Sequence, residues 1–213
     1  MVSLRQRLAA IYQKKKDYLF LDTETTGLGN CQIIELAIID LMGNTLINTR
    51  LNPTGDISDV ATKIHGISKE DLKLSPTLPN IWAKFQEVTE GKIVLIYNAD
   101  FDLNALASSL KAWKMKSLLS VRYDCVMMMY SKFVGEPGKY AGSHKWQKLP
   151  GGNHTALGDC QATLAVIKKM WRGLDADNYV LKARPIAAKF EYQYVPPVQQ
   201  NITFDAFSEM FPF

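Results

Sequence analysis

The stretch Tyr18-Leu19-Phe20-Leu21-Asp22-Thr23-Glu24-Thr25-Thr26-Gly27-Leu28 decides how this chain folds. Its first four residues form an apolar run without polar alternation, which predicts a short strand buried on both faces. Asp22 and Glu24 follow directly, and two residues that lie two positions apart on a strand share one face. Gly27 then lets the chain leave the strand in a sharp turn.

Two carboxylates this close together repel each other, and each raises the pKa of the other. A divalent cation removes the conflict, and magnesium prefers hard oxygen ligands of this kind. The alternative is an ordinary strand end followed by a polar loop that caps a helix. The acidic pair alone leaves both interpretations open, so the remaining acidic segments must decide between them.

The second acidic segment is His154-Thr155-Ala156-Leu157-Gly158-Asp159. Apolar residues recur from here at helical spacing and predict one apolar stripe: Leu157, Cys160, Leu164, Ile167 and Trp171. Asp159 lies at the edge of that stripe, so we expect it to face a partly buried cleft. His154 follows a glycine-rich loop, and histidine is the residue type suited to accepting a proton from water near neutral pH. A lone histidine is more often structural, but the acidic set favours a general base.

The third segment, Ile93-Val94-Leu95-Ile96-Tyr97-Asn98, predicts another strand, and a helix follows it. Asp100 and Asp102 could each cap that helix. We assign the cap to Asp100 and a metal-facing role to Asp102. A pair of magnesium ions that cuts a phosphodiester bond needs the resulting set of four carboxylates and one histidine: Asp22, Glu24, Asp102, Asp159 and His154.

In these motifs the chain resembles the DEDDh, or DnaQ-like, family of 3′→5′ exonucleases. The strings Asp-x-Glu-Thr-Thr-Gly-Leu, Asn-x-x-Phe-Asp and His-x-x-x-x-Asp occur in the family order, and the resemblance covers residues 17–172. The tyrosine branch of the superfamily is excluded, because Thr155 stands four residues before Asp159. The resemblance implies an α/β fold with an RNase H-like mixed sheet flanked by helices.

The resemblance also implies a role for each member of the set. Asp22 would hold both metal ions, Glu24 and Asp159 one of them, and Asp102 the other, while His154 would be the general base. The cofactor would be two Mg²⁺ ions, for which Mn²⁺ substitutes. Glu24 would also contact the terminal 3′-hydroxyl. The products would be a nucleoside 5′-monophosphate and a strand shortened by one unit.

Substrate contacts are implied at six further positions: Thr25, Leu28, His65, Ile67, Asn98 and Phe101. Leu28 and Ile67 match positions that pack against the terminal base, and such apolar contact tolerates any base. His65 is either a turn residue before Gly66 or a contact to the terminal nucleotide, for which a backbone role is favoured. We interpret Asn98 as fixing the strand end and the metal site.

The stretch 135–150 departs from the family, in which a helix is common here. It is rich in glycine, lysine and aromatic residues, and we predict a shorter, looser segment beside the site. In one interpretation Lys139, Lys145 and Lys148 contact phosphates and Trp146 stacks on a base. In the other, Trp146 and Leu149 pin the segment to the core while the lysines are solvated. Both interpretations stay open.

The remaining expected elements are a helix through Leu4, Leu8, Ile11 and Tyr12, strands 31–40, 44–51 and 117–123, and helices 77–88 and from Asp124. A chain of 213 residues suffices for one α/β domain. We predict an N-terminal helix (1–16), an exonuclease domain (17–174) and a C-terminal extension (175–213). The aromatic extension either packs on its own domain or contacts a protein partner or a second copy.

The composition is consistent with a nucleic-acid enzyme. The net charge of +4 suits a partner rich in phosphate. Three scattered cysteines without zinc spacing favour a reducing, cytoplasmic location over a disulfide framework. No apolar run reaches the length of a membrane span, and the N-terminus lacks a signal-peptide core.

The resemblance implies a 3′→5′ exonuclease that acts on single-stranded or frayed 3′ ends, and we predict that it favours DNA, as in proofreading or repair. The alternative is the same chemistry on RNA ends or short oligonucleotides. The intact acidic set disfavours a non-catalytic nucleic-acid-binding or scaffold protein.

Overall fold

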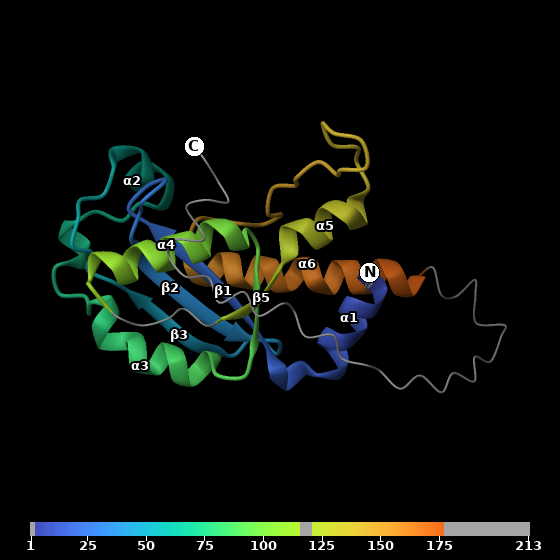
Figure 1. Ribbon diagram of the computed structural model, residues 1–213, viewed down its shortest axis with the longest axis horizontal. Coiled ribbons are helices and arrows are strands. Elements are labelled where there is room, and N and C mark those ends of the chain that lie inside the picture. The colour runs from blue at the N-terminus through green and yellow to red at the C-terminus, as the bar shows by residue number, and fades with distance from the viewer. Residues whose placement is uncertain (1–2, 116–120, 177–213) are drawn as a thin grey trace.

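The computed structural model describes residues 3–115 and 121–176. Its elements in chain order are α1 (Leu4–Gln13), η1 (Lys15–Asp17), β1 (Tyr18–Thr25), β2 (Ile33–Asp40), β3 (Thr45–Arg50), α2 (Asp59–His65), η2 (Glu70–Leu72), α3 (Leu78–Thr89), β4 (Ile93–Ile96), α4 (Ala99–Ala112), β5 (Arg122–Cys125), α5 (Val126–Val134) and α6 (Ala156–Ala176) (Figure 1). The strands form one sheet in the order β3-β2-β1-β4-β5. β2 is antiparallel to β1 and β3, whereas β4 is parallel to β1 and β5. The predicted mixed sheet flanked by helices is confirmed.

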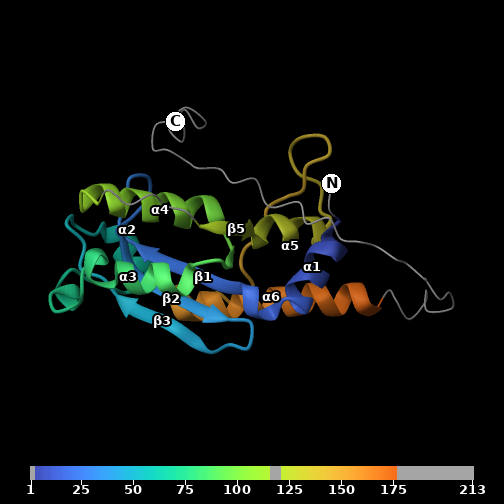
Figure 2. The same ribbon diagram turned by 60° about the horizontal axis from the view of Figure 1, so that its bottom comes forward.

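Strand β1 lies at the centre of the sheet and is buried on both faces, as its apolar run predicts. Tyr18 and Phe20 join the apolar cluster formed with α1, α5 and α6. Leu19 and Leu21 join the opposite cluster, formed with α3 and α4. Alternation along one strand therefore assigns every following residue of β1 to a known helix layer (Figure 2).

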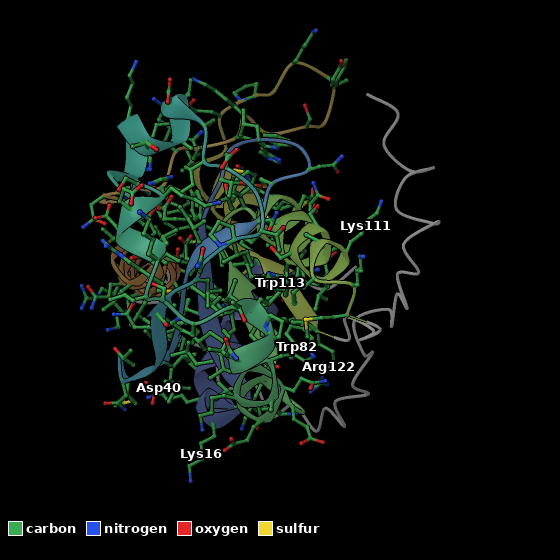
Figure 3. All side chains as sticks on the ribbon, turned by 90° about the vertical axis from the view of Figure 1, so that its left-hand side faces the viewer. Lys16, Asp40, Trp82, Lys111, Trp113 and Arg122 are labelled. Atoms are coloured by element: carbon green, nitrogen blue, oxygen red, sulfur yellow. The ribbon has the colours of Figure 1, made fainter. Side chains whose placement is uncertain are left out.

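The helices at the two faces are fixed by aromatic as well as aliphatic side chains. Trp82 of α3 and Trp113, at the end of α4, belong to the second cluster (Figure 3). In the first cluster Leu8 of α1 is fully buried, and Tyr12 stacks on Trp171 of α6 at 4.6 Å between ring centroids. The predicted first helix thus shares its core with α6. Within the described residues, no helix is both long and apolar enough to cross a lipid bilayer.

Two predicted boundaries are wrong. Helix α4 begins at Ala99 with Asn98 in the N-cap position, so Asp100 lies in the first turn and does not cap the helix. Helix α5 begins at Val126 and not at Asp124, because Asp124 continues the parallel ladder opposite Leu95 of β4. The first part of the strand predicted over 117–123 and the predictions for 177–213 fall outside the described residues.

Candidate active site

Strand β1 divides its polar residues between the two helix layers. Asp22 and Glu24 follow Phe20 in alternation and therefore face α6, whereas Thr23 faces α4. Thr23 and Thr25 are buried, while the two carboxylates remain partly accessible. The shared face predicted for Asp22 and Glu24 is observed.

Helix α4 brings Asp102 to this strand end. Asp102 is only 4% exposed, and Thr23 Oγ1 donates a hydrogen bond of 2.7 Å to its Oδ1. Since Thr23 belongs to β1 and Asp102 to α4, this bond fixes the carboxylate against the central strand. The threonine between the two acidic residues of β1 therefore positions a third acidic residue.

The N-terminal turn of α6 supplies Asp159 and, just before it, His154. The backbone N–H of Asn153 donates a 2.8 Å hydrogen bond to Asp159 Oδ1. A Cβ atom at Gly152 would approach the same oxygen to 3.2 Å, so a small residue is needed there. His154 is exposed and has a φ of 58°, in the left-handed region. Potential ligand atoms of Glu24, His154 and Asp159 all lie within 4.8 Å of one another.

These side chains line one cleft of about 560 Å³. It contains all five residues of the acidic and histidine set, together with five of the six predicted substrate contacts: Thr25, Leu28, His65, Asn98 and Phe101. Ile67 is the exception and is only 2% exposed, because its side chain packs with Ile34 and Leu72. The prediction that Ile67 packs against a base therefore needs correction. The exposed aliphatic residues of the cleft are Leu28, Val60 and Ile64.

His65 uses both ring nitrogens within the protein. The Ile67 backbone N–H donates to Nδ1 at 3.0 Å, so the ring proton is assigned to Nε2, which lies 3.2 Å from the carbonyl oxygen of Thr25. Burial lowers the pKa of His65 and thereby favours this neutral form. The ring ties the end of α2 to the end of β1, consistent with a turn residue; contact with a nucleotide stays a prediction.

Burial and the neighbouring carboxylates raise the pKa values of Glu24, Asp22 and Asp102. Burial, reinforced by Asp159, Glu35 and Asp102, raises the pKa of Glu24 to about 8. Burial and the neighbouring carboxylates raise the pKa of Asp22 well above its ordinary value. For Asp102, burial raises the pKa to about 7 even though the hydrogen bond from Thr23 opposes it.

This donor set fits divalent cations. Within residues 3–115 and 121–176, no lysine or arginine forms an ion pair with Asp22, Glu24, Asp102 or Asp159. Carboxyl oxygen atoms gathered in a half-buried cleft without a basic partner are the ligands that a hard cation prefers.

Sequence reasoning missed Glu35, which lies beside the set. Glu35 pairs with Glu24 in the β1–β2 ladder, and its Oε2 accepts a 2.8 Å hydrogen bond from the backbone N–H of Ala156, the first residue of α6. Arg50 Nε lies 3.6 Å from Glu35 Oε1. Glu35 therefore joins β2 to the helix that carries Asp159. An acidic residue inside the apolar run of β2 is the signal that could have identified it.

The stretch 135–150, named here the 135–150 loop, contains no helix, as predicted, but it is not loose. A bridge joins Pro137 to His144, and the N–H of Gly138 donates to Ser143 O at 2.9 Å. Trp146 is 71% exposed, so the interpretation that it pins the loop to the core is wrong. Leu149 does pack against the first apolar cluster.

Comparison with known proteins is consistent with this geometry. The family model described as "Exonuclease" matches residues 19–167. The "Uncharacterized exonuclease CP81" of Escherichia phage 186 is 35% identical over 187 residues, which cover 78% of this chain and 96% of the phage protein. The DNA polymerase III subunit epsilon of Rickettsia felis is 38% identical over 128 residues, which cover 55% of this chain and 56% of that subunit.

Solved structures share the fold at lower identity. Exonuclease X in complex with 5′ overhanging duplex DNA has a TM-score of 0.52 and 22% identity, over 73% of this chain and 92% of that chain. The nuclease domain of 3′hExo, a DEDDh family member bound to rAMP, has a TM-score of 0.51 and 13% identity, over 73% and 92%. The sheet and its helices are thus those of the DnaQ-like, RNase H-like fold. Because the family model matches residues 19–167, which is more than half of the chain, the chain belongs to the exonuclease family.

Proposed function

We propose that this protein is a metal-dependent 3′→5′ exonuclease that releases nucleoside 5′-monophosphates and favours DNA. The observation that carries the proposal is the convergence of Asp22, Glu24, Asp102, Asp159 and His154 on one cleft. Ligand atoms of three of these residues come within 4.8 Å of one another. We propose two Mg²⁺ ions as the cofactor, with Mn²⁺ as a substitute.

The four carboxylates would hold the cations: Asp22, Glu24, Asp102 and Asp159. When bound, such ions activate water as a nucleophile and stabilise charge on the phosphate oxygens. His154 accepts the proton as the water oxygen attacks phosphorus. The bond between phosphorus and the 3′-oxygen of the preceding nucleotide breaks, and the proton that this oxygen needs comes from solvent.

The cleft also offers contacts for the terminal nucleotide. The exposed aliphatic side chains of Leu28, Val60 and Ile64 present a surface on which a flat base can pack without regard to its identity. Glu24 can accept a hydrogen bond from the terminal 3′-hydroxyl. Thr25, Asn98 and Phe101 complete the proposed contacts, with His65 acting through its backbone.

The preference for DNA is supported by relatives, because their names include subunits of DNA polymerase III and an exonuclease in complex with duplex DNA. Because the solved nuclease domain of 3′hExo is bound to rAMP, RNA ends are included among the substrates to be tested. A role in proofreading or repair is proposed on the same ground.

A substrate panel tests the proposal. Single-stranded DNA, duplex DNA with a recessed or mismatched 3′ end, and RNA, each labelled at the 5′ end, are offered with Mg²⁺ or Mn²⁺. We expect a ladder of products shortened one nucleotide at a time, faster on DNA, and no product when EDTA is present or Asp22 is replaced by asparagine. Release of nucleotides from the 5′ end would overturn the polarity, and equal rates on RNA and DNA would overturn the repair role.

Two further parts of the proposal concern the setting of the enzyme. Three free cysteines, of which Cys31 and Cys160 are buried, support a reducing, cytoplasmic location.

The segment 175–213 is proposed to contact a protein partner or a second copy. Light scattering of the full chain and of a chain ending at residue 176 tests the contact with a second copy. The same number of subunits per particle in both proteins would exclude that contact.

A further inference from the structure

The exposed aromatic side chains of the described chain are concentrated in one place. Only Tyr140, at 70%, and Trp146, at 71%, are exposed aromatic residues there, and both belong to the 135–150 loop. The same sixteen residues carry three lysines and one glutamate. Single exposed apolar residues are ordinary, but two exposed rings within one basic loop have the chemistry of a single-strand binding surface.

The loop is held in one shape. Besides the Pro137–His144 bridge, the N–H of Lys145 donates to Glu136 O at 3.0 Å, and their side chains form an ion pair at 3.2 Å. Tyr140 O accepts from the N–H of Ser143 at 3.0 Å. A ring presented by a pre-ordered segment loses little conformational entropy when it binds a ligand.

The returning limb of the loop is tied to the cleft. Tyr97, at the end of β4, lines the cleft and donates its hydroxyl proton to Gln147 O at 2.8 Å. Leu149, two residues later, lines the cleft itself. Trp146 and Lys148, both exposed, are the immediate neighbours of the anchored Gln147. The rest of the loop, which connects α5 to α6 along the chain, projects away from the body beyond α5 in two views (Figure 1, Figure 2).

We propose that the 135–150 loop binds the nucleotides that precede the terminal one in a single strand, with Trp146 stacked on a base and Lys148 beside a phosphate. This inference rests on the proposed function, since a strand whose 3′ end occupies the cleft must leave it along the rim. Lys145 contributes less charge, because it is paired with Glu136. Stacking is tolerant of sequence, as a degrading enzyme requires.

The first arm of the test measures binding of a 5′-fluorescein-labelled oligothymidylate of about ten nucleotides, long enough to span the terminal site and the loop, in EDTA by anisotropy. We expect Trp146→Ala to weaken binding by about 5-fold to 150-fold, the range measured for lost base–aromatic stacks. Trp146→Phe, which keeps a ring, should restore most of the affinity. Met42→Ala, a matched exposed apolar residue in the turn between β2 and β3, should change nothing.

The second arm separates the loop from the catalytic cleft. Hydrolysis of the p-nitrophenyl ester of thymidine 5′-monophosphate, which has no preceding nucleotide, should be equal in wild type and Trp146→Ala. Equal affinity of these two proteins for the oligothymidylate would overturn the loop proposal even if the ester is hydrolysed. If the wild type hydrolyses neither the ester nor any 3′ end, the proposed function fails, while the binding arm still decides the loop.

The third arm tests Lys148. Lys148→Gln should reduce the slope of log affinity against log salt by about 0.7, the value for one lost phosphate contact with a single strand. Lys84→Gln on α3, whose lysine is also exposed, should leave the slope unchanged. An unchanged slope in Lys148→Gln would remove the phosphate contact from the proposal.

Discussion

The acidic residues of the cleft and its histidine are held in very different ways. Asp22 and Glu24 stand on the central strand, and Asp102 is buried and bonded to Thr23. His154 is exposed, lies in the turn before α6, and has a left-handed backbone with φ 58°. Charges that stabilise a transition state must be fixed in advance, whereas a residue that accepts a proton needs only to reach one water. We therefore expect a larger loss of activity from changes on the acidic side (Asp22, Glu24 and Asp102) than from changes on the histidine side (His154).

Breaking the acidic side should have the largest effect. We expect Asp22→Asn to lower the rate of 3′-end hydrolysis by at least about a thousandfold, because metal ions contribute several kcal/mol to such reactions. The same variant should raise the melting temperature in EDTA. Burial and the neighbouring carboxylates disfavour the charged form of Asp22, and asparagine carries no charge. Hydrolysis assays and calorimetry measure the two outcomes. A variant that is both inactive and less stable would indicate a folding defect.

Breaking the histidine side should cost less. We expect His154→Ala to slow turnover by about a hundredfold or more, the usual scale for a lost general base, with little change in KM. Steady-state hydrolysis of a labelled 3′ end measures both quantities. His154→Gly, which relaxes the left-handed backbone, should lose the same activity, because the ring and not the turn is required. Undiminished activity in His154→Ala would assign the base role to another group.

The link between the two sides can be weakened at Glu35. Because Glu35 accepts a hydrogen bond from the first residue of α6, Glu35→Ala should misplace Asp159 and lower activity by about tenfold, with weaker activation by Mg²⁺. Glu35→Gln keeps an acceptor oxygen and should retain most of the activity. Titration of the rate with Mg²⁺ distinguishes the variants. Equal losses in both would show that the charge of Glu35 matters and not its hydrogen bond.

The same contrast explains what the sequence could predict. The apolar run of β1 and its two carboxylates specify a buried strand and a shared face, because alternation on a strand is a local property. The positions of Asp102 and Asp159 at the cleft followed from motif order. Contacts between distant segments were missed, including the bond from Thr23 to Asp102 and the anchoring of α6 by Glu35.

Errors occurred where tertiary packing decides between neighbours. Ile64 and Ile67 are both aliphatic residues near Gly66, yet Ile64 lines the cleft and Ile67 is buried. The left-handed cap at Gly66 turns the chain between them and sends the second side chain toward Ile34. Likewise, the glycines of the 135–150 loop predicted looseness, whereas backbone hydrogen bonds close it.

The smallest expected effect is a pH dependence of stability that arises from the buried carboxyl groups. The pKa of Glu24 rises from 4.5 to about 8 on folding, so between these values the folded protein holds a proton that the unfolded chain has lost. Stability without metal is therefore fully present below the lower value and falls as the pH rises through the window. We expect the melting temperature in EDTA to drop by roughly a few degrees across it, and Mg²⁺ to raise it more at the alkaline end. Glu24→Gln should reduce this dependence; a wild-type melting temperature that increases across this window would contradict the raised pKa that burial and the neighbouring carboxylates give Glu24.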